Sequence, residues 1–169
     1  RLLATADVLV ETFPPGRAAP LGLDYRSLRR RFPRLIVVSV TNFGQTGPYR
    51  HLLATDIVAS AMGGHMHVNG DRERGPVRTL APQAFAQVNF QAAVGTAIAL
   101  YARGDMGPGQ HVDVSMQEAM TNAMDHAQQT WDIRRVNTYG PGIRRSTAGV
   151  LGSSYLFETA DGWVAALYA

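Results

Sequence analysis

The sequence of 169 residues contains no cysteine and no lysine. The absence of cysteine excludes disulfide bonds and thiolate-bound metals. The absence of lysine excludes the phosphate-binding lysine of a P-loop, and no G-x-G-x-x-G pattern occurs either. No apolar run reaches the roughly 18 residues that cross a bilayer. We therefore expect a cytoplasmic protein that does not contact a membrane. We also expect that it binds no nucleotide through a P-loop or a glycine-rich dinucleotide-binding loop.

Acidic residues are absent from one long stretch. Between Glu73 and Asp105 there is neither aspartate nor glutamate. The stretch contains a predicted helix from Gln83 to about Arg103, which opens just after Pro82 and is apolar on most of its faces. A helix that is apolar all round is usually buried, so we expect it to lie in the domain core.

Basic residues are all arginine, and the formal net charge is only +3. The one tight basic run, Arg29-Arg30-Arg31, is interpreted as a solvated helix end, because cations are favoured at a helix C-terminus. No aromatic platform accompanies it, which argues against nucleic-acid binding. His65 and His67 have no evident third partner, so we expect no metal site.

The first part of the chain has the pattern of a β-α-β unit. Asp7–Glu11 and Leu35–Val40 are short apolar runs that predict buried parallel strands. Between them a helix is predicted from Leu23, with Asp24 as its N-cap, and it ends before Pro33. This order of elements predicts an α/β fold with a Rossmann-like parallel sheet. Residues 42–49 then form a loop at the carboxyl end of the second strand, where ligands usually bind in such sheets.

The second part continues this pattern after a turn. A short helix is predicted at 56–62, and the Gly107-Pro108-Gly109 turn leads into a strand at 110–114. Ser115 caps a further helix, with Glu118 in capping-box spacing and three methionines on one face as core filling. Residues 149–169 are predicted to form two strands around a turn at 160–162. We assign residues 1–132 to the central part of a large domain and 133–169 to a linker and the start of a smaller one, with the fold incomplete at both ends.

These segments together resemble the family III CoA-transferases, the CaiB/BaiF family. The residues that carry the resemblance are Ala6–Gly16, Leu21–Tyr25, Phe32–Ile36, Phe43–Tyr49, Asp56–Gly64, Gly107–Ser115 and Thr159–Val164. The resemblance implies the large Rossmann-like domain of that family in an interlocked dimer. It also implies acyl-CoA and small carboxylic acids as substrates, with coenzyme A moved from one acid to another. A racemase branch instead epimerises the carbon next to the thioester.

The transferase mechanism that the resemblance implies needs an aspartate that attacks the thioester carbonyl. The family places it at the start of the long apolar helix, and register with the Gly107–Gln110 turn puts Phe85 at that position. A phenyl ring can neither attack a carbonyl nor accept a proton. The histidine that the racemase branch uses is also missing, because Thr55 occupies its expected position just before Asp56. We therefore name no catalytic residue.

The resemblance also implies residues that contact coenzyme A. In this sequence they are Thr12, Phe13, Pro14, Gly16, Leu21, Thr55 and Asp56. Pro20 replaces an arginine that is frequent in the family, and Arg17 is a nearby substitute. Asp56 can alternatively be interpreted as the N-cap of its own helix. Phe13 can alternatively be interpreted as a core residue.

Three hypotheses remain open at this point. The chain belongs to an active CoA-transferase that uses another carboxylate, from Asp56, Asp71, Glu73 or a partner chain. Alternatively it is a non-catalytic CoA-binding subunit or paralogue, partnered with a chain that carries the aspartate in a heterodimer rather than a homodimer. The third is a simple acyl-CoA or nucleotide binding module.

Overall fold

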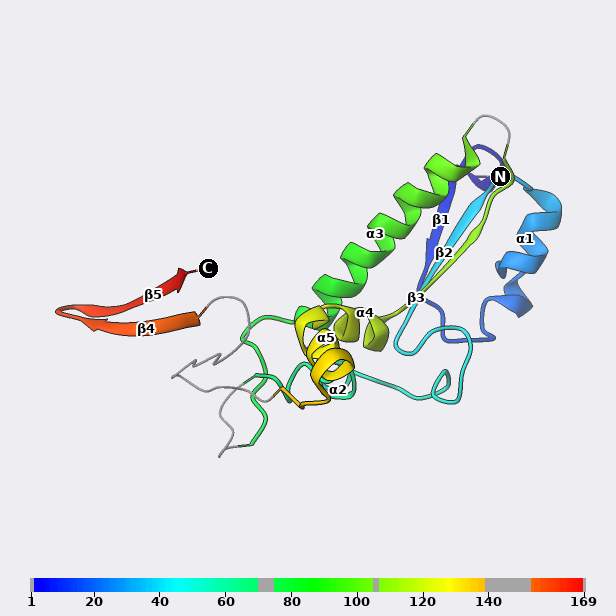
Figure 1. Cartoon of the computed structure of the whole chain (residues 1–169). Helices are drawn as coiled ribbons and strands as arrows, with labels where there is room; N and C mark the ends of the chain where they lie inside the picture. The colour runs from blue at the N-terminus through cyan, green and yellow to red at the C-terminus, as the bar shows by residue number, and fades with distance from the viewer. Residues whose placement is uncertain (1, 70–74, 105–106, 139–152, 169) are drawn as a thin grey trace.

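The computed structural model describes residues 2–69, 75–104, 107–138 and 153–168. Its centre is a parallel sheet of three strands in the order β1-β2-β3 (Figure 1). The strands are β1 (Val8–Glu11), β2 (Ile36–Thr41) and β3 (His111–Ser115). Val10 pairs with Val38, and Val38 pairs with Val112. The α/β class and the parallel sheet predicted from the sequence are confirmed. No helix in the described ranges is both long and apolar enough to cross a membrane.

Helices cover the two faces of this sheet (Figure 1). Alternate residues of β2 point to opposite faces. Val37 joins Leu28 of helix α1 (Tyr25–Arg31) in one buried cluster. Ile36 and Val38 join a larger cluster on the other face, together with residues of helix α3 (Gln83–Arg103). The apolar run of β2 is therefore explained by burial on both sides.

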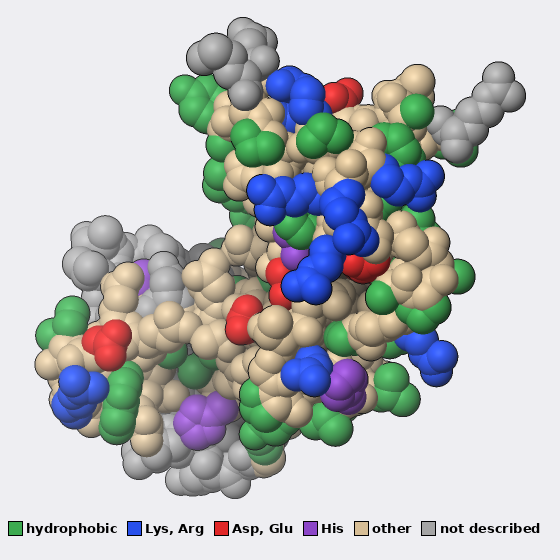
Figure 2. Space-filling model, turned by 90° about the vertical axis from the view of Figure 1, so that its right-hand side faces the viewer, with side chains coloured by type: hydrophobic (Ala, Val, Ile, Leu, Met, Phe, Trp, Pro, Cys, Tyr) green, Lys and Arg blue, Asp and Glu red, His purple; other side chains and the backbone are tan. Residues whose placement is uncertain are grey.

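Helix α1 begins and ends as its sequence predicts. Asp24 is the N-cap, and its carboxylate accepts a hydrogen bond from the backbone N–H of Ser27 at 3.1 Å. Hydrogen bonding from the Ser27 side chain, together with this backbone bond, holds the pKa of Asp24 below its ordinary value. The basic run at 29–31 forms the exposed last turn of the helix. Basic side chains gather on this side of the molecule (Figure 2).

Helix α3 is less buried than its composition predicted. Small residues such as Ala92 and Ala99 face the sheet, and Gly95 lies so close to Val112 that an added Cβ would be 2.8 Å from it. The bulky residues face away, since Phe90 is 63% and Tyr101 91% exposed. The three strands of the described sheet cover one stripe of the helix. Ala84, Val88, Ala92 and Ala99 on that stripe belong to the larger buried cluster, so the expected place of α3 in the core is confirmed for this face.

Three shorter helices lie at the carboxyl end of the sheet. Helix α2 (Asp56–Met62) has the predicted bounds, and α4 (Met116–Asn122) is capped by Ser115, whose hydroxyl accepts from the N–H of Glu118 at 3.3 Å. The predicted single helix through the methionines is broken, and α5 (Asp125–Arg134) follows separately. The carbonyl of Thr121 accepts from the N–H of Met124 in a tight turn and from the side chain of Gln128, which explains the break.

The remaining described elements are short. Two 3-10 turns, η1 (Leu2–Ala4) and η2 (Ala19–Leu21), flank the first strand. Strands β4 (Ser153–Thr159) and β5 (Gly162–Tyr168) form an antiparallel pair, as the turn at 160–162 predicted. Residues 139–150, most of the stretch expected to be irregular, lie outside the described residues. The division of the chain at 132 stays a prediction.

The Gly107–Gly109 turn is held against the start of β2. The N–H of Gly109 donates to the carbonyl of Pro33 at 2.7 Å, and Tyr25 donates its hydroxyl to the carbonyl of Gly109. An added Cβ at Gly109 would collide with the backbone of Leu35. The glycine is therefore required by close backbone contact, which also fixes the entry of β3 into the sheet.

We expect Gly109→Ala to lower the free energy of unfolding by about 1–3 kcal/mol, because the backbone must move to admit the methyl group. Urea denaturation of the purified protein measures this change. Gly75→Ala is the control, since nothing lies within 4 Å of its added Cβ. Equal stabilities of the two variants would contradict the packing argument.

The cap at Asp24 predicts a dependence of stability on pH. Asp24→Ala should lower the free energy of unfolding by about 1 kcal/mol at neutral pH. Because the folded-state pKa is lowered, the ionised cap stabilises the fold above the unfolded pKa of about 3.9 and loses this effect as pH falls towards the folded value. The cost of the alanine variant should shrink over that range in urea titrations. Asp24→Asn keeps an acceptor that does not titrate, so its advantage over alanine should not change with pH.

Candidate functional site

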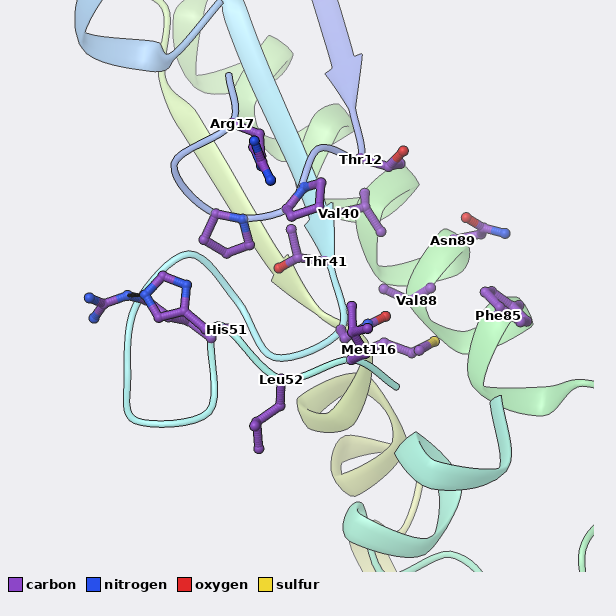
Figure 3. A pocket seen from close by; sticks show the side chains of 15 residues that line it. Thr12, Arg17, Val40, Thr41, His51, Leu52, Phe85, Val88, Asn89 and Met116 are labelled. Carbon is purple, nitrogen blue, oxygen red and sulfur yellow. Dashed lines mark hydrogen bonds between the residues drawn. The ribbon is translucent and has the colours of Figure 1, made fainter. Parts of the chain in front are cut away.

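A cavity of about 510 Å³ opens at the carboxyl edge of the parallel sheet (Figure 3). It is formed by the loop after β1, the end of β2 with the loop that follows, the first turns of α3, and the start of α4. Its lining residues are Thr12, Pro14, Pro15, Arg17, Val40, Thr41, Asn42, Arg50, His51, Leu52, Leu53, Phe85, Val88, Asn89 and Met116. This is the edge at which ligands bind in open α/β sheets.

The charged side chains among the described lining residues carry one sign. They are Arg17 and Arg50, and no described aspartate or glutamate lines the cavity. Arg50 donates a hydrogen bond from Nε to Nε2 of His51 at 2.9 Å, so these two side chains lie together. In Figure 3 Arg17 and His51 stand on the side away from α3, whereas Phe85 and Asn89 project from α3. The cavity thus has a cationic side and a largely apolar side.

A tight turn directs Arg17 towards the cavity. The N–H of Arg17 donates to the carbonyl of Pro14 at 2.9 Å, and Gly16 has a φ of 85°. Proline in the second place and a glycine of positive φ in the third are typical of a type II turn. Any residue with a side chain would be strained at Gly16. The Pro-Pro-Gly sequence therefore fixes where the arginine stands.

One polar group in the cavity wall is left without a partner. Thr41 is 9% exposed, and its hydroxyl makes no hydrogen bond within the described parts of the chain. A buried hydroxyl without a partner costs free energy, so such groups are rare in folded proteins. The hydroxyl oxygen itself is buried, so it lies within the cavity wall and not at its surface.

Phe85 lies in the first turn of α3 and lines the cavity, with half of its side-chain surface exposed. Val88 and Asn89 follow one turn later along the same wall. The side chain at this position can reach a molecule held in the cavity. That Phe85 occupies the position of a family nucleophile stays a prediction from sequence register.

Asp56 has a different structural role from the one expected. Thr55, not Asp56, is the N-cap of α2, and its side chain makes no capping bond. The buried Asp56 carboxylate instead accepts from the N–H groups of Ala84 and Phe85, at 2.9 and 3.3 Å. The side chain of Arg78 lies 3.7 Å away. The interpretation of Asp56 as a cap for its own helix was wrong: it caps the start of α3, where Pro82 offers no side-chain bond.

The structure brings only some of the predicted coenzyme A contacts to the cavity. Thr12 and Pro14 line it, whereas Phe13, Gly16, Leu21, Thr55 and Asp56 are outside its lining. Phe13 is 36% exposed in this chain and belongs to neither of its buried clusters, and its N–H donates to the Glu11 carboxylate at 2.7 Å. Whether any of these residues contacts coenzyme A stays a prediction.

Sequence reasoning missed most of the cavity wall. Arg50, His51 and Asn89 carried no motif that distinguished them from surface residues, although Asn89 is one helical turn after Phe85. Asp71 and Glu73, which were considered as alternative carboxylates, lie outside the described residues. Within the described residues, no three histidine, aspartate or glutamate side chains are grouped to hold a metal.

The Asp56 cap predicts a large effect of a single substitution. Asp56→Ala should lower the free energy of unfolding by about 2–3 kcal/mol, because two buried N–H groups lose a charged acceptor. Asp56→Asn retains the acceptor oxygen and should cost less. Asp132→Ala, which removes an exposed ion-pair partner of Arg135, is the control and should change stability by less than about 0.5 kcal/mol. Chemical denaturation measures all three, and equal costs at Asp56 and Asp132 would contradict the cap.

Comparisons with known proteins agree with this fold. The model of CoA-transferase family III matches residues 1–169. The chain is 40% identical over 97% of its length to the succinyl-CoA:(R)-benzylsuccinate CoA-transferase subunit BbsE of Thauera aromatica, and 32% identical over 97% of its length to a succinate–glutarate CoA-transferase of Agrobacterium fabrum. It spans 38% and 40% of the length of these relatives.

A solved structure of a family member has a similar fold. A CaiB/BaiF family protein from Brucella suis superposes with a TM-score of 0.84 at 29% identity. The match covers 96% of this chain and 42% of that one. With a family model that matches every residue of the sequence, the chain belongs to CoA-transferase family III.

Proposed function

We propose that this protein takes part in the transfer of coenzyme A between carboxylic acids as an acyl-CoA-binding subunit. The attacking carboxylate is supplied by a different chain, a paralogue that carries the aspartate. In this proposal the cavity at the sheet edge holds part of the acyl-CoA thioester, and Phe85 lies beside it without taking part in bond making.

The observation that carries the proposal is that no described residue of the cavity wall has a carboxylate. Neither aspartate nor glutamate is among these lining residues, and Phe85 stands in the first turn of α3. Exchange in this family is expected to begin with a carboxylate that attacks the thioester carbonyl. That step forms a mixed anhydride and releases the CoA thiolate. The thiolate then attacks the enzyme-side carbonyl of the anhydride, so the donor acid leaves as a carboxylate and an enzyme thioester remains. No lining residue in the described part of the chain has the carboxylate that the first step requires.

Asp56 is a poor substitute for the missing nucleophile. Its Oδ1 atom accepts two backbone hydrogen bonds from α3, and its side chain is buried beside Arg78. To attack a thioester it would have to leave the helix start uncapped and break these bonds. The geometry therefore favours a structural role for Asp56 and disfavours activity of this chain through it.

One relative supports the proposal of a divided enzyme. The Thauera aromatica relative is described as a subunit of its CoA-transferase. A chain that works beside a second, different chain need not carry every catalytic group itself. We extend this arrangement to the present protein, as a heterodimer with a paralogue in preference to a homodimer.

A trapping experiment tests the proposal. The purified full-length protein, alone and with its co-purified partner, is incubated with an acyl-CoA, and the acyl-enzyme is captured with hydroxylamine or borohydride. We expect mass spectrometry to find a modified acidic residue on the partner only. A modified aspartate or glutamate on this chain alone would show that it is an active transferase by itself. Binding of acyl-CoA with no adduct on any co-purified chain would favour a simple binding module.

Phe85→Asp is the complementary test. If residue 85 has the geometry of the nucleophile, the variant should gain thioester exchange that the wild-type chain lacks, measured as label transfer between two acids. Phe85→Asn is the matched control, because it has the same shape but no nucleophilic carboxylate. Activity in both variants, or in neither of two correctly folded variants, would contradict the assignment of this position.

A further inference from the structure

Two of the loops that form the cavity are each held by a carboxylate of the sheet. In the loop after β1 (residues 12–18), the N–H of Phe13 donates to the carboxylate of Glu11 at 2.7 Å. In the loop after β2 (residues 42–55), the N–H of Gln45 donates to both carboxylate oxygens of Asp113, at 3.2 and 3.0 Å. Residues of both loops line the cavity, whereas neither of the two carboxylates does.

The two carboxylates lie in one row across the sheet. Glu11 pairs in register with Ser39, and Ser39 pairs with Asp113, so the three side chains point to the same face. Val37, two residues before Ser39, is buried in the cluster on the side of helix α1. Val40, which lines the cavity, points to the opposite face. The carboxylates therefore influence the cavity only through the loops that they hold.

The bond to Glu11 fixes the start of a segment that has little conformational freedom. Two prolines with a fixed φ follow Phe13, Gly16 has a φ of 85°, and the N–H of Arg17 donates to the carbonyl of Pro14. Glu11 is 8% exposed and forms no ion pair among the described residues. Burial of an unpaired carboxylate is unfavourable, and the hydrogen bond from the loop offsets part of this cost.

The bond to Asp113 connects the second loop to a different strand, because 68 residues separate Gln45 from Asp113. Gly44 lies against the same carboxylate, whose two oxygens would be 3.7 and 3.9 Å from an added Cβ. Phe43 is 7% exposed, and its ring centroid lies 6.1 Å from that of Tyr49. This aromatic contact carries the constraint along the loop towards the part that lines the cavity.

From these observations we propose that Glu11 and Asp113 are positioning residues, which hold the loops after β1 and β2 in the arrangement that forms the ligand cavity. Because each bond belongs to a separate loop, loss of one acceptor should loosen one loop and leave the other in place. The inference rests on the proposed function for its ligand, an acyl-CoA. The order of the loops can be measured without any ligand.

Limited proteolysis with trypsin measures the two loops separately, because each contains a single arginine, Arg17 or Arg50. The full-length protein is compared with Glu11→Ala and Asp113→Ala, and the peptides are quantified by mass spectrometry. Loss of a hydrogen bond to a charged group should raise cleavage about 10- to 100-fold, after Arg17 in the first variant and after Arg50 in the second. Cleavage after Arg103, whose side chain is held by Asp7 at the other end of the sheet, should not change.

Ser39→Ala is the matched control. Ser39 lies between the two carboxylates in the same row, and its hydroxyl pairs with Nε2 of His111 at 2.9 Å and not with a loop. This variant should loosen neither loop. Glu11→Gln and Asp113→Asn keep an acceptor oxygen and should retain most of the protection. Unchanged cleavage of its own loop in an alanine variant overturns the role of that carboxylate, and equal cleavage in Ser39→Ala overturns the inference as a whole.

Hydrogen exchange of the wild-type protein is a second measurement, which decides the matter if an alanine variant fails to fold. The amides of Phe13 and Gln45 should exchange more slowly than that of the exposed Thr46, since their N–H groups are bonded to carboxylates. Equal exchange rates for the three amides would overturn the inference.

Calorimetry with butyryl-CoA tests the consequence for binding. Each alanine variant should bind about 10-fold more weakly than the wild type, because the ligand must then order a loosened loop. Ser39→Ala should bind as the wild type does. Loosened loops with unchanged affinity would overturn the positioning role. If the wild-type protein does not bind butyryl-CoA, the proposed function fails, and the trypsin and exchange results still decide whether the carboxylates hold the loops.

Discussion

Strand β2 is the element on which the rest of this structure depends. It is hydrogen-bonded along both edges, to β1 and β3, and the side chains of Ile36, Val37 and Val38 are almost completely buried. Each face of the strand anchors a different helix, so the positions of α1 and α3 are both set by its alternating side chains. The carboxyl end of β2 then becomes the floor of the cavity, through Val40 and Thr41. The core thus surrounds the first residues of β2, and the candidate site lies at the carboxyl end of the same strand.

The candidate site combines rigid and loop-borne parts. Thr41, Val88 and Met116 belong to the packed core and give the cavity a fixed wall. Arg17 and Arg50 extend from loops whose courses are set by local geometry, such as the positive φ at Gly16. Burial favours apolar ligand groups near the wall, and the loops place charge at the opening. Loop residues such as these can change at little cost to the core.

Local sequence signals predicted the elements of this fold well. Asp24 and Pro33 bounded α1, Gly63 followed α2, and the acid-free apolar stretch gave α3 its observed limits. Non-local effects could not be predicted in this way. The cap of α3 comes from Asp56, which is 28 residues before Ala84 and has the local appearance of a cap for its own helix. The residues of the cavity wall could not be predicted either. Arg50 lies in a loop, and the path of a loop leaves no periodic pattern in the sequence.

The link between Asp56 and α3 also has a consequence for the order in which the chain folds. A side-chain cap three residues away forms as soon as its helix does, with almost no loss of chain entropy. The cap across 28 residues requires a loop to close first, and closure costs free energy before any contact repays it. We expect the first turn of α3, which carries Phe85, to become ordered together with the docking of α2, because Ala84 and Phe85 donate their N–H groups to Asp56 in that helix.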